Sequence, residues 1–172
     1  AIACSRYFHM YGGKDGDLAP IAMAFRKHAQ LNPIAMRRNP MSREDYMNSR
    51  WIIDPMRLFD CCQNNEGGAC IIVTSAERAG DLPKRPGYVL GTGECVTHQM
   101  VSQMPSFKSW DAARVAGERA FRMSGVKHAE IDVAELYDAF TIVPMLALEE
   151  LGFCKAGESG AFVSGQRTAP GG

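Results

Sequence analysis

Tyr137 and Asp138 are the residues whose types and placement best suit proton-transfer chemistry. They lie in "AELYDAFTIVPMLALEELGFC", residues 134–154, where a strand-like stretch ending in "ELY" leads into an apolar helix pattern that ends at Gly152. If Thr141 caps this helix, both side chains lie at a strand's carboxyl end beside a helix N-terminus. Ligands bind at that position in α/β folds, and first-turn amides favour a developing oxyanion. A tyrosine there can exchange a proton with the oxyanion.

The same pair of residues also has a purely structural explanation. Tyr137 would be an edge residue whose hydroxyl donates to a neighbouring carbonyl, and Asp138 would only cap the helix. The local sequence leaves both explanations open, so the decision depends on the rest of the chain.

The cysteines and glycines suggest no second catalytic centre. Cys61 and Cys62 are adjacent, which is not a usual zinc pair, so we expect buried small side chains and no metal site. Gly91 and Gly93 follow a predicted strand but lack the third glycine of a dinucleotide fingerprint, and close backbone packing explains them better. The six cysteines are at positions 4, 61, 62, 70, 95 and 154, without paired CxxC spacing or a leading signal segment. This usage favours reduced thiols and a cytoplasmic location.

The composition fits one domain-sized unit with no polyanionic partner. The chain has 172 residues, and its 19 basic and 19 acidic residues cancel without forming long blocks of one sign. A nucleic-acid footprint is therefore not expected. The apolar runs are also shorter than the roughly 20 residues that a membrane-spanning helix needs.

Strand and helix patterns alternate along the chain, which predicts an α/β fold with a mixed sheet and helices on both faces. We expect helices in "GDLAPIAMAFRKHAQLNP" (capped by Asp17), in "MSREDYMN" (with Ser42 and Asp45 as a capping box) and in "SWDAARVAGERAFRMSG" (capped by Ser109). An extended segment is expected in "RWIIDPMRLFDCC" and strands in "ACIIVTS", "YVLGTGECVTH" and "EIDVAELY". The prolines and charges of "DLPKRPGY" make residues 83–87 the predicted linker.

Two long segments resemble one known superfamily. "DPMRLFDCCQNNEGGACIIVTSAERA" resembles the segment that closes the first half of thiolase-superfamily subunits, with Glu66 and Gly67 where that family usually has Asp-Gly. "EIDVAELYDAFTIVPMLALEELGFCKAGESGAFV" is similar to the second half of the lipid-transfer, or sterol-carrier-protein, branch. The likeness runs along essentially the whole chain.

The resemblance implies a two-halved thiolase-like fold, usually dimeric, that acts on acyl-CoA thioesters, with coenzyme A entering as part of the substrate and no covalently bound cofactor. It also implies that the chain corresponds to the middle of a longer subunit. Residues 1–82 would end the first half and residues 88–172 would begin the second. The family's nucleophilic cysteine and its "GHP" histidine segment match nothing in this chain.

Tyr137 stands where other thiolases carry the Asn of "NEAF" or the His of "HDxF". The "YDxF" pattern is similar to that of steroid side-chain aldolases in the lipid-transfer branch, and this likeness implies retro-aldol cleavage with Tyr137 as acid or base and Asp138 orienting the loop. Two alternatives are an acetyl-CoA acyltransferase with a cysteine outside this chain and a catalytically silent lipid-binding or partner subunit. By analogy with the branch, a homodimer that also binds an OB-fold, zinc-ribbon subunit is expected.

Overall fold

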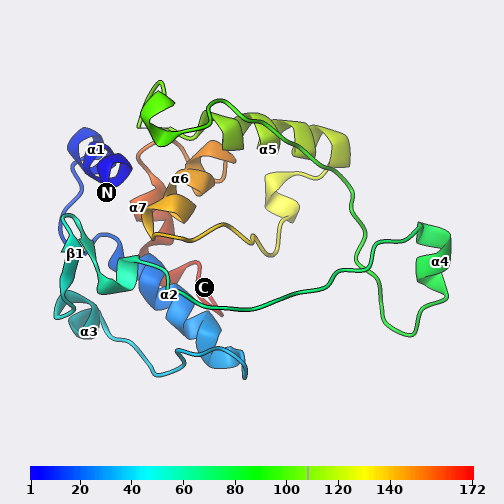
Figure 1. Cartoon of the computed structure of the whole chain (residues 1–172), viewed down its shortest axis with the longest axis horizontal. Helices are drawn as coiled ribbons and strands as arrows, with labels where there is room; N and C mark the ends of the chain where they lie inside the picture. The colour runs from blue at the N-terminus through cyan, green and yellow to red at the C-terminus, as the bar shows by residue number, and fades with distance from the viewer. Residues whose placement is uncertain (108) are drawn as a thin grey trace.

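The computed structural model describes residues 1–107 and 109–172 and shows a helical body from which one long excursion extends (Figure 1). None of the helices in these residues combines the length and the apolarity needed to cross a membrane. The elements in chain order are α1 (Ile2–Tyr11), α2 (Ala19–Leu31), α3 (Arg43–Met47), β1 (Trp51–Ile53), β2 (Met56–Arg57), η1 (Leu58–Asp60), α4 (Ala76–Gly80), η2 (Val101–Gln103), α5 (Asp111–Ser124), η3 (His128–Glu130), α6 (Ile142–Glu150), α7 (Ser159–Val163) and η4 (Ser164–Gln166).

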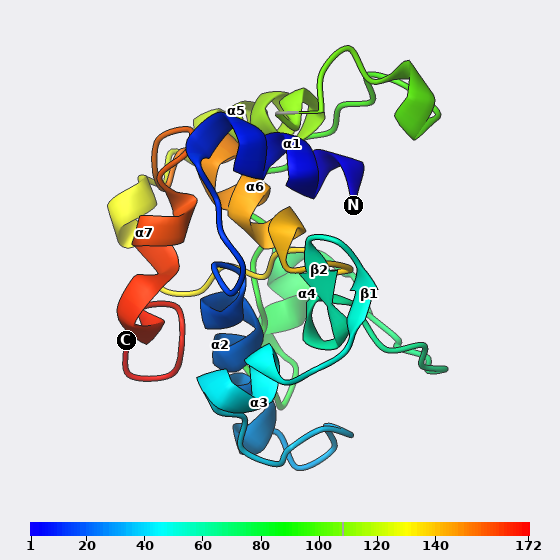
Figure 2. The ribbon, with the colours of Figure 1, turned by 90° about the vertical axis from the view of Figure 1, so that its left-hand side faces the viewer.

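Helix α6 lies at the centre of the body, with α1, α7 and α5 around it and α2 and α3 on one side (Figures 1 and 2). Its sequence is apolar on almost every side, as expected for a helix that is surrounded by protein. The core joins α6 to α1, α2, α3 and β2 through buried apolar side chains. These are Cys4, Tyr7, Leu18, Ala19, Ile21, Ala22, Tyr46, Met56, Ile142, Met145, Leu146, Leu148 and Val163.

The predicted helices form, but two of their caps differ from expectation. Ser42 and Asp45 make the predicted capping box at α3. Asp17 is not the cap of α2, because Leu18 takes that position and the Asp17 carboxylate accepts from the Lys14 amide instead, at 2.7 Å. Trp110, and not Ser109, is the N-cap residue of α5. Both helices therefore begin without a side-chain cap.

The three predicted strands are not formed as strands, and this corrects the expected mixed sheet. In the part of the chain that the structure describes, the only sheet is the antiparallel pair β1 and β2. The segments at residues 69–75, 88–98 and 131–137 pair with no strand, and Glu130 ends the short helix η3. Ile71, Ile72 and Val73 are each 86% exposed. A strand needs a neighbour for its backbone groups, and none of these segments has another strand beside it here.

The excursion at residues 63–90, called the arm below, carries α4 at its tip, far from α1 and α2 (Figure 1). The predicted linker, residues 83–87, lies within the arm. Immediately after the arm, the backbone returns to α5. A Cβ atom built on Gly93 would lie 1.9 Å from the Ala116 carbonyl oxygen, and one on Gly91 would also clash with the helix. Close backbone packing therefore explains both glycines, as predicted.

Candidate functional site

Tyr137 and Asp138 lie in the extended segment that enters α6, and both side chains are exposed. Tyr137 is 70% exposed, and neither side chain makes a hydrogen bond or ion pair with any other described residue. The structural explanation required the Tyr137 hydroxyl to bind a carbonyl and Asp138 to cap α6. Neither contact is present within residues 1–107 and 109–172, and Thr141 takes the N-cap position of α6. The phenol therefore faces away from the described residues.

The backbone around Tyr137 is held firmly although its side chain is not. On its amino-terminal side, Leu136 packs partly buried against the core. On the other side, the Ala139 carbonyl accepts from the Cys62 amide at 3.0 Å, and Phe140 pairs with Cys61 in an isolated antiparallel bridge. Cys61 and Cys62 thus lie against the "YDAF" segment, and the exposed hydroxyl is carried by an anchored loop.

Thr141 ties the end of this loop to Asp60. The Thr141 amide donates to the Asp60 carbonyl at 3.0 Å, and the Thr141 hydroxyl donates to Asp60 Oδ1 at 2.8 Å. Thr141 holds the predicted cap position, but its hydroxyl is used in this contact and does not bond to the helix amides. The first-turn amides of α6 therefore have no side-chain cap.

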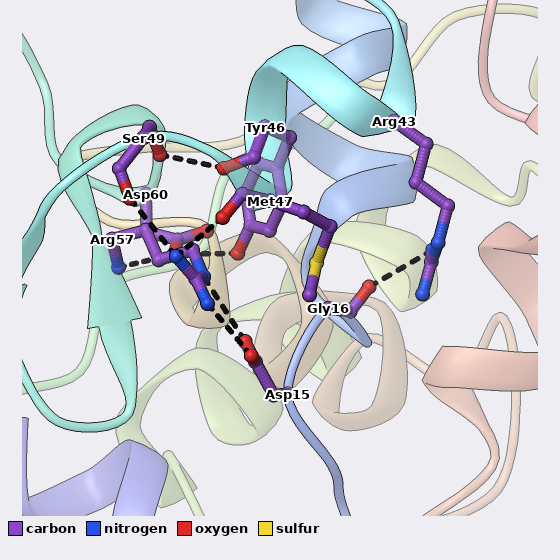
Figure 3. Close-up of polar contacts among 8 residues, drawn as sticks. All are labelled: Asp15, Gly16, Arg43, Tyr46, Met47, Ser49, Arg57 and Asp60. Atoms are coloured by element: carbon purple, nitrogen blue, oxygen red, sulfur yellow. Dashed lines mark hydrogen bonds and ion pairs between the residues drawn. The ribbon is translucent and has the colours of Figure 1, made fainter.

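The Asp60 carboxylate is buried and accepts from two further donors. Its Oδ2 accepts from the Tyr46 hydroxyl at 2.6 Å and from the Arg57 amide at 2.7 Å (Figure 3). Asp60 and Tyr46 are each only 1% exposed. Burial, and then the hydrogen bond to Asp60, raise the pKa of the Tyr46 phenol, so it stays protonated and remains a donor at neutral pH. Asp60 is thus held at both of its oxygens.

The Arg57 guanidinium supports the same cluster from the other side (Figure 3). It binds both carboxylate oxygens of Asp15, at 2.7 and 3.1 Å, and donates to the carbonyls of Met47 and Ser49. It also lies 3.9 Å from the centre of the Trp51 ring. The planar guanidinium suits this arrangement, because its several N–H groups can donate to four acceptor atoms at once. The cluster therefore joins the loop before α2 to α3, β1 and β2.

The opposite end of α6 is fixed by a separate polar cluster. The Tyr7 hydroxyl donates to Glu149 Oε1 at 2.5 Å and lies 2.8 Å from the Ser159 hydroxyl. The Ser159 amide also donates to Glu149 Oε1, at 3.1 Å. These contacts connect α1, α6 and α7 beside a pocket of about 290 Å³. Helix α6 is thus held at both ends, and Tyr137 lies beside the Asp60 end.

Comparisons with known proteins agree with this architecture. A family model described as "Thiolase C-terminal domain-like" matches residues 93–172, which include Tyr137 and α5 to α7. The solved structure of an "Ltp2-ChsH2(DUF35) aldolase" superposes with a TM-score of 0.89 at 38% sequence identity, over 95% of this chain and 44% of that chain. Residues 93–172 are a thiolase C-terminal-like domain, and the chain has a thiolase-like fold. Its thiolase-like fold is partial, as the resemblance implied.

Two curated relatives of this chain carry names of enzymes. A "17-hydroxy-3-oxo-4-pregnene-20-carboxyl-CoA lyase" of Mycobacterium tuberculosis is 40% identical, with 95% of this chain aligned to 44% of the relative. A "Steroid side-chain-cleaving aldolase" of Thermomonospora curvata is 38% identical, with 95% of this chain aligned to 43% of the relative. The chain spans less than half the length of the curated relatives it matches.

The sequence analysis identified Tyr137 and Asp138 but missed the cluster that holds their loop. Nothing in the spacing of Asp15, Arg57 and Asp60 predicted that they meet around α3. One available signal was "PMRLFDCC", where two charged residues interrupt an apolar run. Charged residues in such a run are rarely buried unless they are paired, so they indicate a polar network inside the thiolase-like body.

Three of the cysteines in this thiolase-like chain are poorly suited to nucleophilic catalysis. Burial raises the pKa of the Cys4 thiol to about 12 and that of Cys154 to about 11. Burial, and then the negative charge of Asp60, also raise the pKa of Cys61. These thiols are almost fully protonated at neutral pH, whereas the thiolate is the nucleophile.

Proposed function

We propose that this chain forms part of the active site of a lyase that cleaves a carbon–carbon bond of an acyl-CoA thioester. The reaction is a retro-aldol cleavage of a β-hydroxyacyl-CoA with a lipid or steroid side chain. Tyr137 transfers the proton, and Asp138 orients the loop that carries it. The names of the two curated relatives support this reaction class. Because the match covers less than half of each, the proposal concerns the full-length protein.

The chemistry needs two proton transfers and no covalent acyl-enzyme. A base removes the proton of the β-hydroxyl group, the bond between the α and β carbons breaks, and a carbonyl forms at the β carbon. The bonding electron pair passes to the thioester as an enolate, and the α carbon then takes a proton. Tyr137 serves one of these two transfers, for which an exposed hydroxyl on an anchored loop is suited. The uncapped amides of α6 add positive potential beside it.

The observation that carries the proposal is the exposed Tyr137 hydroxyl, which no described residue binds, at the entrance to α6. The test is Tyr137→Phe in the full-length protein, with release of the shorter acyl-CoA from 17-hydroxy-3-oxo-4-pregnene-20-carboxyl-CoA as the readout. We expect kcat to fall by about 10²- to 10⁴-fold, as is usual when a general acid or base is lost. The melting temperature should stay unchanged, because the side chain is exposed and removal of its hydroxyl breaks no contact.

Tyr88→Phe is the matched control, because Tyr88 lies in the arm and is 61% exposed. Its kcat should equal that of the unsubstituted protein. Normal turnover in the Tyr137→Phe variant would remove Tyr137 from the mechanism and return it to a surface role.

The two alternative functions make different demands on this chain. An acetyl-CoA acyltransferase needs a nucleophilic cysteine, and the raised pKa values of Cys4, Cys61 and Cys154 make these three poor candidates. Trapping of an acyl-enzyme by mass spectrometry would favour the transferase. A catalytically silent subunit would bind acyl-CoA without turnover, and Tyr137→Phe would then change nothing.

The proposal extends to partners, location and chain organisation. We propose a cytoplasmic homodimer that binds a second subunit of the OB-fold, zinc-ribbon type, since the similar solved structure is named for Ltp2 together with ChsH2(DUF35). Residues 1–82 and 88–172 belong to the two halves of the fold, and residues 83–87 link them. Analytical ultracentrifugation of the purified protein, with and without that subunit, tests both assembly steps.

A further inference from the structure

The loop that carries Tyr137 is joined to the body through the segment at residues 60–62. Two of the three joining hydrogen bonds run between backbone groups, from Cys62 to Ala139 and from Thr141 to Asp60. The third runs from the Thr141 hydroxyl to Asp60 Oδ1, at 2.8 Å, between side chains that are both buried. It is therefore the one member of this set that a single substitution can remove without changing the backbone.

Asp60 is a fixed anchor for this bond. Its second oxygen accepts from the Tyr46 hydroxyl and the Arg57 amide, and the Arg57 guanidinium is itself held by Asp15. A carboxylate with donors at both oxygens has little freedom to rotate, so the position of Asp60 Oδ1 is set by α3 and β2. Thr141 then transmits that position to the residues just before it.

We infer that Asp60 and Thr141 are positioning residues that set where the Tyr137 hydroxyl stands relative to a bound substrate, an inference that rests on the proposed function. Only Asp138, Ala139 and Phe140 separate Tyr137 from Thr141. A misplacement of about 1 Å at a reacting group can lower the rate by about 100-fold. The buried hydroxyl–carboxylate bond holds the loop to the body close to the reacting residue.

The first test is Thr141→Val in the full-length protein, which replaces the hydroxyl by a methyl group of similar size. We expect kcat for acyl-CoA cleavage to fall by about 10- to 100-fold, with KM changed by less than about threefold, because the loop contributes to the chemical step. Thr141→Ser keeps the donor and should restore most of kcat. If the Val variant does not fold, Thr141→Ala removes the same hydroxyl without adding a methyl group.

Ser159→Ala is the control for a general loss of stability. Ser159 is a fully buried hydroxyl at the opposite end of α6, and its removal leaves Tyr7 bound to Glu149. It should lower the melting temperature about as much as Thr141→Val and leave kcat unchanged. An equal loss of kcat in both variants would overturn the positioning role, because the effect would then follow stability alone.

A double variant tests whether Thr141 acts through Tyr137. In Tyr137→Phe, the reacting hydroxyl is gone, so adding Thr141→Val should lower kcat no further. If the fold-losses of kcat in the two single variants multiply in the double variant, Thr141 acts independently of Tyr137, and the inference fails. If Tyr137→Phe alone has normal turnover, the proposed function fails. If Tyr137→Phe is inactive while Thr141→Val keeps full kcat, only the inference fails.

Discussion

The body around α6 and the arm at residues 63–90 differ in how deeply they bury similar side chains. In the body, Ile21 is 2% exposed and packs in a core shared by several helices. In the arm, Ile72 is 86% exposed and extends into solvent. Charged groups differ as well, since Asp15 is paired with a buried arginine whereas Glu77 of α4 is exposed.

This difference shows which structure can be completed by the chain itself. The helices of the body pack their apolar side chains against one another, and the polar side chains of the body form hydrogen bonds with other residues of the body. The β-branched segments of the arm need strands at their sides, and no described residue supplies one. Apolar segments left open in this way are typical of surfaces that are covered in a larger fold or assembly.

Thiol reactivity gives the largest expected contrast between the two regions. Cys4 in α1 is fully buried with a pKa of about 12, so only about one thiol in 10⁴ is ionised at pH 8. Cys70 in the arm is exposed. Iodoacetamide should therefore label Cys70 at least about 100-fold faster than Cys4, as followed by peptide mass spectrometry.

The labelling result also reports on the arm. If Cys70 is as protected as Cys4 in the full-length protein, the arm is covered there by other polypeptide. Unfolding in urea is the control, because it should make the two thiols react at similar rates.

Matched isoleucine substitutions give the next contrast. Ile21→Ala should lower the free energy of unfolding by about 2–5 kcal/mol, because it leaves a cavity in the core. Ile72→Ala should change it by less than about 0.5 kcal/mol, as is usual for exposed positions. Urea unfolding followed by circular dichroism measures both. Equal losses in the two variants would contradict the exposed arm and show that Ile72 is packed against another segment.

The helices could be predicted from the sequence because their signals are local. The apolar period around Ile21 and Phe25 and the capping box of Ser42 and Asp45 each lie within a few residues. The strand at residues 69–75 has an equally clear local pattern, but its formation depends on neighbours elsewhere. The pattern therefore indicated that residues 69–75 favour an extended conformation, but it could not show whether a neighbouring strand is present.

The candidate site shows the same limit. Tyr137 and Asp138 were identified from their types and their place before a helix, which is local information. The Asp60 and Thr141 pair is separated by 81 positions, and the Arg57 and Asp15 pair by 42. No spacing rule joins residues so far apart, so the residues that hold the loop emerged only from the folded arrangement.

Acid sensitivity gives the smallest contrast between body and arm. The hydrogen bond from Arg57 holds the pKa of Asp15 below its ordinary value of 3.8. The folded protein therefore binds this proton less readily than the unfolded chain, so the pair stabilises the fold above about pH 4. That contribution is lost as the pH falls through the lowered pKa. Because the Asp15 side chain is 43% exposed, we expect it to be below about 1 kcal/mol.

The Asp15→Asn variant should therefore have a lower free energy of unfolding than the unsubstituted protein at pH 6. The difference between the two free energies should become smaller toward pH 3, as measured by urea unfolding. Glu77→Gln is the matched control in the arm. The hydrogen bond from Ser75 also lowers the pKa of Glu77, but this exposed carboxylate stabilises only the isolated turn of α4. Its substitution should leave global unfolding unchanged at both pH values. A difference for Asp15→Asn that stays constant with pH would mean that the lost packing of the side chain, and not its charge, stabilises the body.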